Sequence, residues 1–386
     1  MRKWLSWGLA LVALLFVIRQ VPVRDRCWDA RAAKSTHVAV TRDAQGCVLH
    51  LDTGEVRVSP AECATLTCEP GVVTTLGGAK VGVLAALFAL YVAGTLAWAG
   101  RWQALLGFAG VDLHVLHVWR IVTEAQAGGV VLPGGLGGDA LRIASILTLP
   151  GRPGETRAPA SIVVASVLLD RAVGLSLIAT VAAGMGFFWG GSQAGGLTYA
   201  LAAIPVGVVV GLIALRAAPI DRIRFLNEGR LGRALSPVFA YVRDPRAPRA
   251  MASAAGLSLI VAVLQFVIIR GIVYSLGATP VAEKWVYVGT AMAFIVSALP
   301  TLPGGWGTAD ATYVFFFGMG GLTAGTALGV CLLFRLFWYL LAMGGAVLYV
   351  ARSRAGGTGA AASTPSPSGS QSGPAAGSQA SSTTDP

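Results

Sequence analysis

Five apolar stretches of this chain are each long enough to cross a lipid bilayer, which needs roughly 17–25 mostly apolar residues per helix. They are residues 79–99, 158–189, 197–216, 251–276 and 324–350. A shorter apolar run at residues 4–18 follows two basic residues and is not followed by a small-residue cleavage site. We therefore expect an uncleaved anchor there, with a signal peptide as the alternative. The sequence predicts an all-α polytopic membrane protein with about six full spans.

The composition excludes the common soluble classes. Only 12% of the 386 residues are charged, which is about half the share of roughly 25% in a soluble globular domain. So few charges could not cover the surface of a cytosolic enzyme. For the same reason, the net charge of +11 does not indicate a nucleic-acid-binding protein.

The chain divides into four segments by composition. We expect a membrane anchor at 1–19, an extracytosolic loop domain at 20–77, a polytopic membrane domain at 78–354 and a disordered cytoplasmic tail at 355–386. The tail is predicted to be disordered because it consists of Ala, Gly, Ser, Thr and Pro with almost no apolar bulk.

The loop domain holds four of the five cysteines: Cys27, Cys47, Cys63 and Cys68. An even number of cysteines in a short extracytosolic segment predicts two disulfides, although the sequence leaves three pairings open. A zinc site is the alternative, and the absence of a C-x2-C pair argues against it. Alternating residues at 37–42, 47–51 and 55–58, separated by turn residues, predict a small β-rich meander of three strands.

Two further apolar stretches, 114–149 and 285–319, are each interrupted by a Pro-Gly-Gly unit. The two prolines, Pro133 and Pro303, lie 170 residues apart, and the flanking spans keep roughly the same offset. This spacing predicts an internal repeat with two re-entrant hairpins. The expected loop residues are Pro133, Gly134, Gly135, Gly137, Pro303, Gly304, Gly305 and Gly307. Ordinary turns joining two full spans are the alternative.

The arginines orient the two halves. The loop at 216–250 carries eight arginines and marks the cytoplasmic side, to which we also assign Arg101, whereas the loop at 190–196 is uncharged. The first hairpin then enters from the cytoplasm and the second from the exterior. The halves are predicted to be inverted copies, as in many secondary transporters, with both termini in the cytoplasm.

Six charged residues of the predicted membrane domain are candidate substrate-binding residues: Asp139, Arg142, Asp170, Arg171, Asp310 and Arg335. Charges near mid-bilayer are costly unless they face the bundle interior and find partners. Guanidinium groups suit an anion such as phosphate. The alternatives are helix capping for Asp139 and Asp310 and structural ion pairs for the arginines. We find no metal constellation.

Four motifs occur in an order that resembles a known family. They are PGGLGGDALR at 133–142, LDRAVG at 169–174, PTLPGGWGTAD at 300–310 and FRL at 334–336. Together they resemble the lysylphosphatidylglycerol synthase transmembrane-domain family, also called flippase-like domain proteins, over about residues 80–350. The resemblance covers only the integral membrane part of that family, and we expect no aminoacyl-transferase module.

The resemblance implies a transporter or flippase-like protein of a bacterial inner (plasma) membrane. The expected partner is a membrane lipid, either an anionic lipid or a lipid-linked phosphate moved between leaflets, and no nucleic acid. We expect neither a cofactor nor enzymatic activity. Two alternatives remain open: a membrane-embedded enzyme acting on lipid phosphate, and a non-transporting partner subunit.

Overall fold

The computed structural model describes most of the chain. The described residues are 15, 19, 21–23, 25–28, 38–43, 46–51, 54–65, 67–108, 110–131, 136–149, 159–190, 195–217, 238–278, 280–298 and 305–361. All but two residues of the predicted N-terminal anchor lie outside this set, as does the chain after residue 361.

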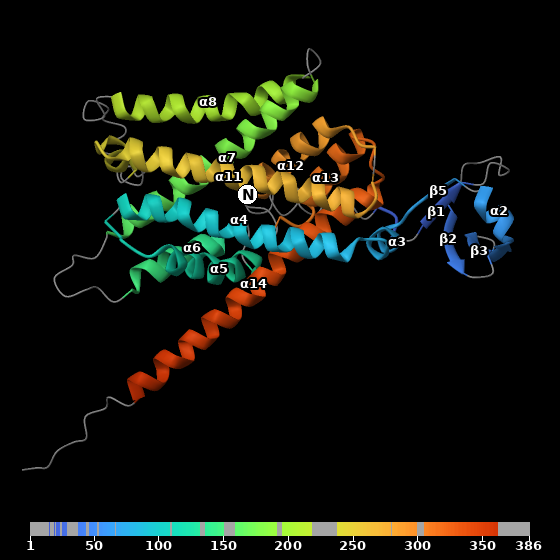
Figure 1. The fold of residues 1–386 in the computed structure, drawn as a ribbon, viewed down its shortest axis with the longest axis horizontal. Helices are drawn as coiled ribbons and strands as arrows, with labels where there is room; N and C mark the ends of the chain where they lie inside the picture. The colour runs from blue at the N-terminus through green and yellow to red at the C-terminus, as the bar shows by residue number, and fades with distance from the viewer. Residues whose placement is uncertain are drawn as a thin grey trace, which may run out of the picture.

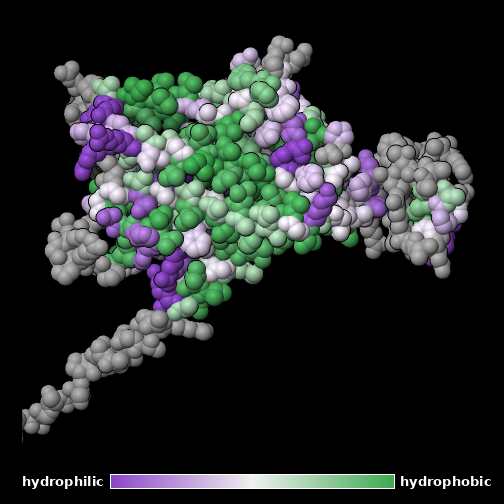
Figure 2. Space-filling view, in the orientation of Figure 1, coloured by the Kyte–Doolittle hydropathy of each residue, from purple (hydrophilic) through white to green (hydrophobic). Residues whose placement is uncertain are grey.

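Five of the described helices are long and apolar enough to cross a membrane. They are α4 (Val81–Phe108), α7 (Ala160–Gly190), α8 (Gly195–Ala217), α11 (Ala247–Ser275) and α14 (Ala324–Ala361). Each coincides with one of the five apolar stretches of the sequence. Figure 2 shows apolar side chains covering the middle of the helical bundle, with hydrophilic side chains gathered mainly toward its ends.

Four shorter helices form two pairs where the sequence predicted two hairpins. The first pair is α5 (Val115–Val131) and α6 (Leu136–Leu147), and the second is α12 (Glu283–Ser297) and α13 (Thr308–Met319). The two members of each pair pack against one another. Small residues permit close packing within the first pair, because a Cβ on Gly128 would lie 2.8 Å from the carbonyl oxygen of Gly137.

The two halves of the bundle repeat the same packing pattern. Helices α4 and α11, the first long helix of each half, lie side by side (Figure 1). One long helix follows each short pair: α7 follows the first pair and α14 follows the second. The first short helix of each pair packs against the long helix that follows the other pair, so α5 contacts α14 and α12 contacts α7. The second short helices, α6 and α13, contact α7 and α14 of their own halves. Helix α8 lies at the edge and packs on α7.

A small β-sheet lies at one end of the bundle (Figure 1). Its strands are β1 (Asp25–Trp28), β2 (Val38–Asp43), β3 (Gly46–Leu51), β4 (Gly54–Val58) and β5 (Thr67–Glu69). The order is β4-β3-β2-β1-β5, and every neighbouring pair is antiparallel. The predicted three-stranded meander is therefore present as β2–β4. Strands β1 and β5 extend it to five strands.

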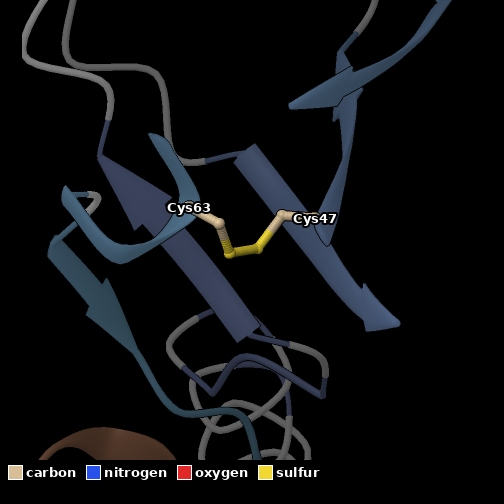
Figure 3. The surroundings of a disulfide bond; sticks show 2 residues. All are labelled: Cys47 and Cys63. Atoms are coloured by element: carbon tan, nitrogen blue, oxygen red, sulfur yellow. A yellow bond between two sulfur atoms is a disulfide. The ribbon is translucent and has the colours of Figure 1, made fainter. Parts of the chain in front are cut away.

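Among the described side chains of this segment, a disulfide links the sheet to a short helix. Cys47, on β3, is bonded to Cys63 on the short helix α2 (Pro60–Thr65), as Figure 3 shows. The cross-link joins the helix to the sheet, in a segment too small to build a large core of its own.

Hydrogen bonds join the sheet segment to the start of the helical bundle. Asp25 Oδ1 accepts a hydrogen bond of 2.8 Å from the amide of Gly71, and the amide of Val72 donates to Pro22 O. Residue 72 begins helix α3 (Val72–Gly77), which packs against α14. Gly325 on α14 allows this approach, because a Cβ there would lie 2.6 Å from the carbonyl oxygen of Pro70.

Helix α14 extends into the segment that the sequence assigned to the C-terminal tail. Helix α14 continues through Ala361, whereas the sequence placed the start of the disordered tail at residue 355. Each residue added to an existing helix gains a backbone hydrogen bond. In addition, no proline interrupts the chain before Pro365.

The register of the sheet predicts the second disulfide. Cys27 lies directly opposite Cys68 in the antiparallel pair of β1 and β5, a spacing that suits a cross-strand disulfide. The side chains of both residues lie outside the described ones, so this pairing stays a prediction. Peptide mapping of the non-reduced protein should find Cys27 linked to Cys68 and only Cys331 as a free thiol. Recovery of reduced Cys27 after denaturation would contradict it.

Candidate functional site

A buried carboxylate joins three helices at the centre of the first half. Asp170, on α7, is only 1% exposed. Its Oδ1 accepts a hydrogen bond of 2.6 Å from Arg101 Nε on α4, and its Oδ2 accepts one of 2.9 Å from Arg142 Nη2 on α6. The indole nitrogen of Trp98 donates a further bond of 3.1 Å to Oδ2. Both carboxylate oxygens are therefore held by charged or aromatic donors.

Local sequence positions these partners. Arg101 and Trp102 come three and four residues after Trp98, which places both of them next to Trp98 on one side of α4. The guanidinium of Arg142 lies 4.0 Å from the ring centre of Trp102, which is a cation–π contact. Gly174 leaves room for Arg101, because a Cβ at that position would lie 2.7 Å from Arg101 Nη1. This explains the glycine that follows the Asp-Arg pair in the sequence.

A second carboxylate bridges the same cluster. Asp139 lies in the first turn of α6, where its Oδ2 pairs with Arg171 Nε and its Oδ1 lies 3.6 Å from Arg142 Nη1. Both side chains of the Asp139–Arg171 pair are partly exposed, at 17% and 30%. We call Arg101, Asp139, Arg142, Asp170 and Arg171 the first cluster.

The second half holds a smaller cluster. Asp310, in the first turn of α13, accepts a hydrogen bond of 2.9 Å from the amide of Gly307 and another of 2.7 Å from Arg335 Nη2. The thiol of Cys331 donates to the same carboxylate. Trp306 stacks on Arg335, with 4.2 Å between the guanidinium carbon and the ring centre. We call Asp310, Cys331 and Arg335 the second cluster.

The two clusters share one motif. In each half, an aspartate at the start of the second short helix pairs with an arginine on the long helix that follows the pair. Asp139 pairs with Arg171 on α7, and Asp310 pairs with Arg335 on α14. Capping of Asp310 and an ion pair of Arg335, each of which the sequence offered as an alternative to substrate binding, occur together at Asp310. In the second half, Gly305 and Gly307 have φ angles of 69° and 78°, which favour glycine and let the chain turn into α13.

Both clusters line a single cavity of about 360 Å³. Its walls come from both halves, including α4, α7, α11, α14 and all four short helices. Arg101, Arg142, Arg171 and Arg335 contribute to the lining, and so do Asp139 and Asp170. Most of the remaining wall is apolar or aromatic. A mostly apolar cavity with a few convergent charged groups is typical of a ligand-binding site.

The charges around the cavity do not cancel. Among the described residues of the two clusters, four guanidinium groups face three carboxylates. The second cluster is balanced, so the extra positive charge belongs to the first cluster. In addition, Arg142 is 2% exposed, and its buried Nε–H donates to no described residue. The arrangement can therefore accept an anionic group.

The structure places the predicted site residues as follows. Asp139, Arg142, Asp170 and Arg171 meet in the first cluster, whereas Asp310 and Arg335 form the second. Pro133, Gly134, Gly135, Pro303 and Gly304 lie outside the described residues. Among the described residues, no group of three or more His, Cys, Asp or Glu is placed to hold a metal ion.

Arg101 was not among the predicted site residues, because the span before it was expected to end at residue 99, which left this arginine on the cytoplasmic side. In the structure α4 continues to Phe108, and Arg101 is 6% exposed inside the bundle. Two signals in the sequence indicate that the helix continues past Arg101. One is the apolar run Ala-Leu-Leu-Gly-Phe at 104–108, and the other is the pair of tryptophans, Trp98 and Trp102, on either side of Arg101.

The fold and cavity can now be compared with known proteins. The family described as "Lysylphosphatidylglycerol synthase TM region" matches residues 71–345. The chain therefore belongs to this family and is an integral membrane protein. No curated protein and no solved structure matches the chain. The matched range includes every residue that lines the cavity, so the site belongs to the family region of the chain.

We predict that Asp170→Asn destabilises the protein. The change leaves Arg101 and Arg142 without their shared carboxylate in a buried place, and breaking such a pair costs about 3–5 kcal/mol. Thermal unfolding of the detergent-solubilised protein should show a clear fall in midpoint temperature. Asp112→Asn, at an exposed position, is the control and should leave the midpoint unchanged. Equal midpoints for both variants would contradict a structural role for Asp170.

Proposed function

We propose that the protein moves an anionic lipid, or a lipid-linked phosphate, between the two leaflets of the membrane. One observation carries this proposal: the central cavity has an unbalanced guanidinium and is walled by both halves of the bundle. Guanidinium groups bind phosphate with charge-assisted hydrogen bonds. The apolar and aromatic remainder of the wall suits the rest of an amphipathic molecule.

The proposal includes two re-entrant hairpins that enter from opposite faces. Helices of 12–17 residues are about 18–26 Å long, which is less than the roughly 30 Å of a bilayer core. The exchange of contacts, α5 with α14 and α12 with α7, supports an inverted repeat. The five long helices and an N-terminal anchor together would make six full spans. Both termini would then lie on the cytoplasmic side of a bacterial inner membrane.

We favour transport over catalysis on lipid phosphate. A catalytic carboxylate must be available to take a proton or attack a substrate. Both oxygens of Asp170 and of Asp310 instead accept hydrogen bonds from neighbouring donors. These contacts favour a binding role for the two clusters.

Arg142→Gln should slow lipid movement by at least tenfold. The variant removes a guanidinium from the cavity but leaves Asp170 paired with Arg101, so we expect the fold to persist. Loss of one charge-assisted hydrogen bond costs about 1.5–3 kcal/mol, or about tenfold or more in rate. The measurement is translocation of fluorescent phosphatidylglycerol in liposomes that contain only the purified protein.

Arg120→Gln is the matched control for that experiment. Arg120 pairs with Glu124 outside the cavity, and Glu124 keeps a second partner, Arg352, after the change. This variant should transport at the wild-type rate. Absence of lipid movement by the wild-type protein would exclude the proposed function. Equal rates for wild type and Arg142→Gln would place the transport site elsewhere.

The hairpin topology is tested by labelling single cysteines introduced at the helix ends in a Cys331→Ser background. His114 and Thr148 flank the first short pair. In the second pair, Lys284 lies in the first turn of α12 and Thr323 follows the end of α13. Impermeant maleimide should label the first two positions only from the cytoplasm and the other two only from outside. Labelling of positions 114 and 148 from opposite faces would make the first pair a full crossing.

A further inference from the structure

One wall of the cavity carries a glutamine that neither cluster uses. Ser258, Val261 and Gln265 lie three and four residues apart on α11, which places them on one face of that helix. Ser258 is anchored to the first cluster, because its hydroxyl accepts a hydrogen bond of 3.3 Å from Arg101 Nη1. Val261 and Gln265 line the cavity. Gln265 therefore lies two turns, about 10 Å, along α11 from Ser258.

Gln265 lacks a partner for its acceptor atom. Its Oε1 is buried and accepts no hydrogen bond from any described residue. Several other polar side chains around the cavity do have partners. Gln126 accepts a bond of 2.9 Å from Trp338, for example, and Asp170 accepts three. A buried acceptor without a donor is unfavourable in an apolar medium, and polar residues within membrane spans commonly mark a substrate pathway.

The first cluster offers the complementary atom. Arg142 Nε is a buried donor that lacks an acceptor among the described residues. The cavity thus has an orphan donor beside a surplus positive charge and an orphan acceptor along α11. One ligand satisfies both if it carries an anionic oxygen and, a few bonds away, a hydroxyl or amine hydrogen.

We propose that Gln265 is a specificity-determining residue that accepts a hydrogen bond from the headgroup of a phosphodiester lipid while Arg142 holds the phosphate. The inference rests on the proposed function and names the substrate class more narrowly. A headgroup with a hydroxyl or amine donor fits the site. A headgroup without one, such as a methyl ester or a quaternary ammonium, leaves Gln265 Oε1 unsatisfied. Sites built to bond a donor discriminate strongly against analogues that lack it.

The test is a competition for binding to the full-length protein in detergent. Equal amounts of phosphatidylglycerol and phosphatidylmethanol with the same acyl chains are added, and native mass spectrometry measures the ratio retained. The two lipids have the same charge, but only the first has headgroup hydroxyls. Wild type should retain phosphatidylglycerol about five- to tenfold in excess, the value of one hydrogen bond. Gln265→Met, which keeps the length of the side chain, should bring the ratio to about one.

Ser275→Ala is the matched control on the same helix. Its hydroxyl bonds to the carbonyl of Ile272 and does not line the cavity. This variant should keep the wild-type ratio. Equal retention of the two lipids by wild type would overturn the inference, as would an unchanged preference in Gln265→Met. Because the readout is binding, a wild-type preference without lipid movement in liposomes would refute transport but leave the site at Gln265 standing.

Discussion

The ion pairs of Asp170 hold the first half of the bundle together. This carboxylate lies within a membrane-spanning helix, where an unpaired charge is strongly disfavoured. Its bonds to Arg101 and Arg142 tie α7 to α4 and to the short helix α6. Two further features depend on this arrangement: Gly174 makes room for Arg101, and the tryptophans of α4 cover the guanidinium of Arg142. The position of α6 in the cavity wall follows from the same contacts.

The two halves share a motif but differ in charge, and this difference has a functional consequence. The pairs Asp139–Arg171 and Asp310–Arg335 occupy corresponding places. Only the first half adds Arg101 and Arg142 around one further aspartate, so the excess positive charge lies to one side of the cavity. An anionic ligand would therefore bind off-centre, nearer the first cluster. Gln265 lies on the α11 wall of the same cavity.

Much of the fold followed from local signals in the sequence. The apolar stretches predicted the five long helices, and the Pro-Gly-Gly units predicted two pairs of short ones, because both signals depend on neighbouring residues. Arg101 was missed because its partner, Asp170, lies 69 residues away, and no linear spacing indicates that pair. Strands β1 and β5 were missed because they have only four and three residues, too few to show alternation. The partners of each buried charge required three-dimensional contacts.

We expect an anionic ligand to complete the excess positive charge of the first cluster. The most direct measurement is a cryo-electron microscopy map of the protein in nanodiscs that contain phosphatidylglycerol. We expect density for a lipid phosphate within hydrogen-bonding distance of Arg142 Nε, with Asp170 still bonded to Arg101. A cavity that holds only acyl-chain density, or that is closed by protein side chains around Arg142, would contradict it.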